Sequence, residues 1–397
     1  METPLKVCAA DTSVIRVGRS GIVQTVTRRS SERLEGLRRS KHLNCGLALG
    51  AFAFLSDLHQ RIALTAVVVM AGFAASLYLP PSDFAQDYLA AAAVRAGMDP
   101  NIPSAQLAQR FGVPNHAVTS VRTAHPPLMT LIAMPYASLA WAGSRILWNL
   151  TLSLVTGVLL VLAQARCRDI ALLAPAWIFG LALGNVDAIV VSLCLLGLSG
   201  RSRSVGLCLG SAAALKVYPV LLIFGLLAVR RYRQAVLSGA FGLIVTVAAT
   251  LFLGVESLYG WLQFLPHNGD RFAVNMLNLS LTKFAGLFGW RTFLITLLGL
   301  VAVALQFRRR TIDPLLAAIL LVSPLSWLQS LPLLTNRLTR EELVACSLAS
   351  LTIVLGWFSG VQWSVYPCVL ASFVLTAIIA RIYVRMYRES GAGAEPL

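Results

Sequence analysis

Two carboxylates four residues apart follow the first long apolar run of the chain, in the stretch "SDFAQDYLAAAAVRAG". If residues 82–96 form a helix, Asp83 and Asp87 lie on the same face of it. A carboxylate positioned on a substrate hydroxyl can accept its proton as a general base. A structural role is the alternative, because Ser82 or Asp83 with Gln86 fits an N-terminal capping box and Asp87 can lie on a solvated helix face.

Polar residues also interrupt two apolar runs in the middle of the chain. Lys216 lies in "AAALKVYPVLLIF", just before a proline, and no neighbouring acid pairs with it. A cation at that place suits a phosphate group, although a lysine that extends to the membrane edge would look the same. Asn185 and Asp187 in "GNVD" are candidates for substrate binding, or they cap a half-helix over 186–199.

Further candidates lie in the polar segments. His125 in "HPPL" either begins a helix or joins Arg122 and Arg271 in binding a phosphate. We also expect three residues to contact substrate: Tyr88, Trp327 and Asn268. Because no DxD or HxxH spacing occurs, we expect neither a metal nor a cofactor.

The composition predicts a polytopic, all-α membrane protein. Of the 397 residues 57% are hydrophobic and 13% are charged, whereas soluble domains carry about 25% charged residues. Several apolar runs approach the ~20 residues that cross a bilayer. The net charge of +16 arises largely from a basic N-terminal segment and from short Arg clusters between apolar runs, which is typical of cytoplasmic loops. Nucleic-acid binding is not expected, because the basic tail lacks interleaved aromatics.

The chain divides into a membrane domain and two tails. We expect residues 1–45 to be a disordered basic cytoplasmic tail rather than a targeting segment, and residues 382–397 to be a cytoplasmic C-terminal tail. The integral membrane domain would cover 46–381, with outer loops at about 80–125 and 255–289. We expect the seven cysteines to be small, buried apolar residues that form no disulfide framework.

About eleven to thirteen spans, some of them short or broken, would place both termini in the cytoplasm. The clearest expected spans are 62–79, 146–168, 235–254, 291–307, 343–358 and 364–380. Residues 126–141 begin with Pro-Pro and would lie at the interface or re-enter. The apolar runs on either side of 184–187 and 215–219 are short for a lone span, and such breaks are tolerated only where protein or a cavity surrounds them.

This topology collects the ionisable and polar groups on the outer face. Such groups at membrane depth are costly and are functional candidates by default. A single outer cavity would be lined by Asp83, Asp87, Asp99, His125, Asn185, Asp187, Lys216, His267, Asn268, Asp270, Arg271 and Asn275.

Five motifs in order resemble glycosyltransferase family 87 of the GT-C superfamily, which includes mannosyltransferases that use polyprenyl-phosphate-mannose. The resemblance covers about residues 60–330, through "SDFAQDYLAAAAVRAGMDP", "HPPLMTLIAMPYASL" with "ILW", "LALGNVDAIVVSLCLLGL", "AAALKVYPVLLIFGLLAVRRYR" and "LLVSPLSW". It implies a GT-C helical bundle whose first outer loop carries the catalytic aspartate.

Individual residues match the pattern of the family or depart from it. Asp83 matches the family's aspartate, Lys216 its lysine before proline, and Asn185 a position usually held by Gln or Asn. Asp87 departs from it, since an aromatic is common there. The family's "SP-x-x-W" is often followed by an acid and a histidine, where this chain has Leu328, Gln329 and Ser330.

The resemblance implies an inverting transfer of a sugar from a polyprenyl phosphate to an extracytoplasmic lipid or glycan acceptor. The expectation that this sugar is mannose comes from the family alone. Asp83 would be the base, and Lys216 with His125, Arg122 or Arg271 would stabilise the phosphate. The protein would lie in a bacterial plasma membrane with its site on the periplasmic face. A transporter or flippase for a lipid-linked substrate, and a catalytically inactive family member, are the alternatives.

Overall fold

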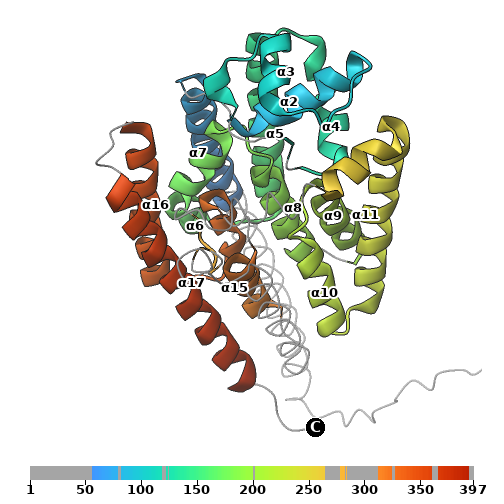
Figure 1. Ribbon diagram of the computed structural model, residues 1–397. Helices are drawn as coiled ribbons and strands as arrows, with labels where there is room; N and C mark the ends of the chain where they lie inside the picture. Colours follow the sequence, from blue (N-terminus) through green and yellow to red (C-terminus); the bar gives the residue numbers. More distant parts are fainter. Residues whose placement is uncertain are drawn as a thin grey trace, which may run out of the picture. The chain divides into compact units, whose positions relative to one another are not determined.

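The computed structural model describes residues 56–78, 82–118, 122–123, 125–199, 202–263, 278–281, 283, 312–323, 327–359 and 365–392. The regular structure of these residues is helical throughout (Figure 1). The chain separates into two units, Met1–His59 and Gln60–Leu397, and the candidate site lies entirely within the second unit. The predicted tail 1–45 and the predicted span 291–307 fall outside the described residues.

Five described helices are long and apolar enough to cross a membrane: Ser56–Tyr78, α5 (Trp141–Leu162), α11 (Tyr232–Leu253), α16 (Arg340–Ser359) and α17 (Val365–Ala392). Large apolar side chains such as Leu251 and Phe252 remain exposed on them, as expected for helices that face lipid. The prediction of an all-α membrane protein is therefore confirmed. The helix α17 continues to Ala392, past the predicted end of the last span at 380, and that end stays a prediction because a helix can extend beyond the membrane.

Shorter helices surround the two predicted breaks. These helices are α6 (Cys167–Leu172), α7 (Ala174–Ala182), α8 (Asp187–Ser199), α9 (Ser202–Leu215), α10 (Val220–Ala228) and α15 (Asp313–Val322). The chain turns between α7 and α8 at Gly184, whose φ of 67° favours glycine. Between α9 and α10 it turns ahead of Pro219. The expectation of short, interrupted helices is confirmed, whereas the total of eleven to thirteen spans stays a prediction.

The polar segment after the first long helix folds into short helices. They are α2 (Ser82–Arg95), α3 (Ser104–Phe111), η1 (Asn115–Ala117), α4 (Pro127–Ala133) and η2 (Tyr136–Ser138). α2 ends at Arg95, and Gly97 two residues later has a φ of 68°, as is common just after a helix. Residues 126–141 form only α4, η2 and the start of α5, so this segment makes no long crossing helix of its own, as the sequence predicted.

Stacked aromatic rings hold α2 against α5. Phe84 is fully buried and stacks on Trp148 with ring centroids 4.8 Å apart and planes 7° from parallel. Trp141 stacks near the same ring at 5.9 Å. Because Phe84 directly follows Asp83 in α2, this packing fixes where the carboxylates of that helix lie.

Glycines allow α9 and α11 to pack closely. A Cβ on Gly210 would lie 2.7 Å from the main-chain oxygen of Ser238, and one on Gly242 would lie 3.0 Å from the oxygen of Gly210. Small residues at such contacts let two helix backbones approach within a membrane. This packing supports Lys216, which directly follows α9.

Candidate functional site

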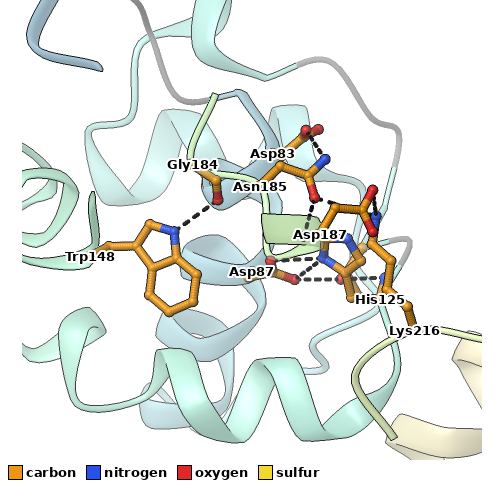
Figure 2. Close-up of polar contacts among 9 residues, drawn as sticks. Asp83, Asp87, His125, Trp148, Gly184, Asn185, Asp187 and Lys216 are labelled. Atoms are coloured by element: carbon orange, nitrogen blue, oxygen red, sulfur yellow. Dashed lines mark hydrogen bonds and ion pairs between the residues drawn. The ribbon is translucent and has the colours of Figure 1, made fainter. Parts of the chain in front are cut away.

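The site begins with Asp83 and Asn185, which are far apart in sequence. The side-chain amide of Asn185 donates a hydrogen bond to Oδ2 of Asp83 over 2.6 Å, as Figure 2 shows. The carbonyl oxygen of the same amide accepts the main-chain N–H of Asp187 over 2.8 Å. Asn185 therefore caps the start of α8, as predicted, and also binds the carboxylate of α2.

The second contact joins the two breaks in the apolar runs. Nζ of Lys216 lies 3.0 Å from Oδ2 of Asp187 and 3.4 Å from Oδ1 of Asn185. The expectation that no acid pairs with Lys216 is wrong, because Asp187 reaches it from another helix. Asp187 is fully buried, and a buried carboxylate needs such a partner. The hydroxyl of Ser330 donates to the same Oδ2 over 3.4 Å.

The third contact lies one turn further along α2. Nδ1 of His125 lies 2.8 Å from Oδ2 and 3.0 Å from Oδ1 of Asp87. Thr123 donates its hydroxyl to Oδ1 over 3.3 Å. Asp87 is only 1% exposed, so the alternative of a solvated helix face is wrong. Because Nδ1 is engaged by Asp87, Nε2 of His125 is the ring atom left for other contacts (Figure 2).

Trp148 holds the first break, at Gly184, in place. Nε1 of Trp148 donates to the carbonyl oxygen of Gly184 over 2.8 Å (Figure 2). Trp148 also stacks on Phe84 of α2. One buried side chain therefore touches both the helix that carries Asp83 and the turn that carries Asn185, which fixes their relative position.

The two aspartates of α2 differ in environment. Burial raises the pKa of the Asp83 carboxyl above its usual range, and nearby Lys216 and His125 and the Asn185 hydrogen bond lower it only in part. Among the described residues, none hydrogen-bonds with Oδ1 of Asp83. Both oxygens of Asp87 are already bound. A partly exposed carboxylate with a raised pKa and a free oxygen is the better proton acceptor of the two.

The structure describes some of the remaining predicted residues, and others lie outside its described part. Tyr88 is buried, donates its hydroxyl to the carbonyl oxygen of Leu139 over 3.0 Å, and packs against Trp141, so its polar end is occupied. Arg122 and Trp327 are partly buried next to Thr123 and η3 (Leu328–Leu334), respectively. Five predicted residues lie outside the described part of the chain: His267, Asn268, Asp270, Arg271 and Asn275.

Sequence reasoning missed several contributors. Thr123 and Ser330 carry no distinctive spacing, and only the fold brings them to Asp87 and Asp187. Sequence reasoning also passed over Lys283, a fully buried lysine that contacts α17 rather than the residues of the site: it donates to the main-chain oxygen of Ser372 over 3.1 Å and to its hydroxyl over 3.0 Å. Its place after "LNLSLT" in an apolar sequence could have drawn attention to it.

The arrangement suits acid–base chemistry on a hydroxyl beside an anion. No group of three metal-ligating side chains gathers within the residues that the structure describes. What gathers instead is a carboxylate with one unoccupied oxygen, a lysine and a histidine whose ring is oriented by Asp87. Charges in such a partly dry site interact more strongly than in water.

Comparison with known proteins agrees with this chemistry. The model of glycosyltransferase family 87 matches residues 123–332, just over half of the chain. The match includes His125, Asn185, Asp187, Lys216 and Ser330, and it begins after α2 with its two aspartates. Searches of curated proteins and of solved structures found no match. The chain belongs to glycosyltransferase family 87, so it is a glycosyltransferase built from membrane-spanning helices.

Proposed function

We propose that the protein transfers a sugar, with mannose as the first candidate, from a polyprenyl phosphate to a lipid or glycan acceptor on the outer face of the membrane, with inversion at the anomeric carbon. The observation that carries the proposal is the contact between Asp83 and the Asn185–Lys216 pair, which places a base beside a cation. A transfer that expels a phosphate needs both groups next to the reacting carbon.

Asp83 is proposed as the base. The acceptor hydroxyl would lie on Oδ1, because Oδ2 already accepts the amide of Asn185. As the hydroxyl oxygen attacks the anomeric carbon, its proton passes to Asp83 and the bond from that carbon to the phosphate oxygen breaks. The products are the new glycoside and the polyprenyl phosphate. The raised pKa of Asp83 favours this proton transfer near neutral pH.

Lys216 and His125 are proposed to stabilise the departing phosphate. Lys216 has three N–H groups and keeps one beyond those that face Asp187 and Asn185. Asp87 holds His125 by Nδ1, which leaves Nε2 for an oxygen of the phosphate. Arg122 and Arg271 would add positive charge, as expected from the sequence. Asp87 is then a positioning residue that acts through His125, rather than a second base.

The membrane setting supports a lipid-linked donor. Five of the described helices are long and apolar enough to cross a membrane, and the charged groups of the site lie on or next to shorter helices. A polyprenyl chain can lie between such helices while its phosphate reaches Lys216. We place the site on the periplasmic face of a bacterial plasma membrane, with both termini in the cytoplasm, because basic clusters between apolar runs favour the cytoplasm.

The proposal is tested in proteoliposomes with the full-length chain. Polyprenyl phosphates radiolabelled in mannose, glucose or arabinose are supplied one at a time with a membrane glycolipid extract. The expected result is label in a new product from the mannose donor, with an anomeric configuration opposite to that of the donor. Retention of configuration would overturn the inverting mechanism. Absence of transfer from every donor, although the donor binds, would favour the inactive relative or the transporter.

A further inference from the structure

Arg145 is a charged residue within an apolar helix, and no acid in the described part of the chain pairs with it. It lies about one turn after the start of α5, a helix long and apolar enough to cross a membrane. Its Nη2 donates a hydrogen bond to the main-chain oxygen of Leu77 over 3.2 Å. Its Nε is buried and has no hydrogen-bond partner among the described residues. An ionisable group at membrane depth is costly and is a functional candidate by default.

The guanidinium group of Arg145 lies toward the membrane surface at which α5 begins. Side chains of a helix lean toward its N-terminus, and Leu77, which accepts the hydrogen bond, is the last but one residue of the helix Ser56–Tyr78. Tyr78 is exposed at the end of that helix, and Trp141 is the first residue of α5. Because tyrosine and tryptophan are enriched at the membrane–water interface, these residues mark the level of the lipid head groups.

The bond to Leu77 uses one of the five N–H groups of Arg145 and leaves its charge uncompensated. A main-chain carbonyl carries only a partial negative charge, even at the C-terminus of a helix. Other partly buried arginines of the described chain have acids as partners: Arg337 lies 2.8 Å from Asp313, and Arg385 lies 2.8 Å from Glu342. A partly buried arginine without such an acid is suited to an anion from outside the chain.

The surroundings of Arg145 favour an anion that carries acyl chains. A guanidinium group binds phosphate oxygens through paired N–H groups. Ile146, Leu147 and Leu150 of the same helix are exposed, so acyl chains can lie along α5 beside the cation. A free phosphate would use the guanidinium group but not these apolar side chains. Polyprenyl phosphate has its own proposed site at Lys216.

We infer that Arg145 binds the phosphate of an anionic phospholipid in the outer leaflet, with the acyl chains of this lipid along α5. The lipid is neither the sugar donor nor the acceptor, and only the choice of leaflet depends on the proposed orientation. It would bridge the end of the helix Ser56–Tyr78 and the start of α5. Trp141 and Trp148, about one turn on either side of Arg145, both stack with Phe84 of α2. The lipid would therefore stabilise the part of α5 that holds α2.

Lipid binding to the full-length chain in a neutral detergent tests the site. Phosphatidylglycerol is titrated, and bound lipid is counted by native mass spectrometry. Arg145→Gln removes the charge but keeps a side-chain N–H for the carbonyl of Leu77. It should raise the Kd for phosphatidylglycerol about tenfold, as expected for a lost charge-assisted hydrogen bond. Arg145→Lys keeps the charge without the paired N–H groups, so its Kd should lie between the two. The wild type should bind phosphatidylcholine, which has no net charge, more weakly.

The matched control is Arg110→Gln, which removes the same charge from an exposed position on α3 and should leave the Kd unchanged. Equal binding by wild type and Arg145→Gln, or equal weakening by Arg110→Gln, would overturn the site. Equal affinity of the wild type for phosphatidylcholine would overturn it as well. If Arg145→Gln does not fold, Arg145→Lys decides, and a wild-type Kd in that variant overturns the site.

Two competitors distinguish the phospholipid from other sources of phosphate. Millimolar inorganic phosphate should not displace phosphatidylglycerol, and polyprenyl phosphate should bind no less tightly to Arg145→Gln than to wild type. Displacement by inorganic phosphate would assign Arg145 to a free anion, and weaker binding of polyprenyl phosphate to Arg145→Gln would assign it to the donor. Either result would overturn the inference. Sugar transfer is measured separately, so the proposed function can stand or fail independently of this site.

Discussion

Replacing Asn185 by serine separates the two roles of its side chain. The amide N–H donates to Asp83 over 2.6 Å, whereas the amide oxygen caps α8 by accepting the N–H of Asp187 over 2.8 Å. Serine is about as good an N-cap as asparagine. Its hydroxyl is too short to reach Asp83 as well. Asn185→Ser should therefore keep the fold but lose the hydrogen bond to the carboxylate of Asp83.

The expected loss of activity follows from the hydrogen bond that disappears. A hydrogen bond to a charged group contributes about 1.5–3 kcal/mol, and 1.36 kcal/mol corresponds to a tenfold change in rate. We therefore expect kcat/KM to fall about ten- to a hundredfold. The Asn185 bond also lowers the pKa of Asp83, so its removal should raise that pKa further and shift the acid limb of the pH–rate profile to higher pH.

The assay compares sugar transfer and thermal unfolding for Asn185→Ser and Asn185→Ala. Alanine removes both the donor to Asp83 and the cap of α8, so it should lower activity to the same degree and also cost about 1 kcal/mol of stability. Serine should lower activity alone. Wild-type kcat/KM and an unshifted pH profile in Asn185→Ser would refute the reasoning that Asn185 positions the base.

Three further changes test the scaffold and the charge of the base. Gly210→Ala puts a Cβ 2.7 Å from a main-chain oxygen of α11, so it should lower Tm by the equivalent of about 1–3 kcal/mol; Gly239→Ala, which meets nothing within 4 Å, should not. Trp148→Phe keeps the ring stack but loses the 2.8 Å bond to the first break, so the transfer rate should fall several-fold; an unchanged rate would mean that this bond is dispensable. Burial raises the pKa of Asp83. The stability that this group contributes is therefore present at low pH and lost as pH rises through its folded-state pKa. Asp83→Asn should for this reason raise Tm at pH 7, and a lower Tm would contradict this.

The elements of the fold that sequence could predict are those set by local pattern. Apolar length identified the spans that became α5, α11 and α16, because about twenty apolar residues in a row cross a bilayer whatever lies beside them. The breaks at 184–187 and 215–219 were visible as polar residues and proline within apolar runs. The end of α17 was not, since its charged C-terminal turns continue the helix to Ala392 beyond the apolar pattern.

The sequence predicted which residues form the candidate site, but not which of them contact one another. Spacing placed Asp83 and Asp87 on one face of a helix, yet their different partners come from elsewhere in the chain. The pairing of Lys216 with Asp187 depends on how α8 and α9 pack. Local sequence does not encode how these helices pack, so a lysine that looked unpaired in fact forms an ion pair with Asp187.

The departure after "SPLSW" gains a physical meaning only in three dimensions. From sequence, Gln329 and Ser330 looked like the loss of a histidine. In the fold, Ser330 contacts Asp187 and Gln329 packs on α7 next to the first break. Because Gln329 and Ser330 are uncharged, Asp187 is the charged partner of Lys216 in the fold. The sequence pattern alone could not indicate this pairing.

The measurement that tests the central claim most directly is sugar transfer in proteoliposomes by wild type, Asp83→Asn and Asp87→Asn, each supplied with radiolabelled polyprenyl-phosphate-mannose and glycolipid extract. If Asp83 is the base, Asp83→Asn should lose about 10²–10⁴-fold of the rate and still bind the donor. Asp87→Asn should lose less, because it acts through His125. Full transfer by Asp83→Asn, or loss confined to Asp87→Asn, would contradict the account.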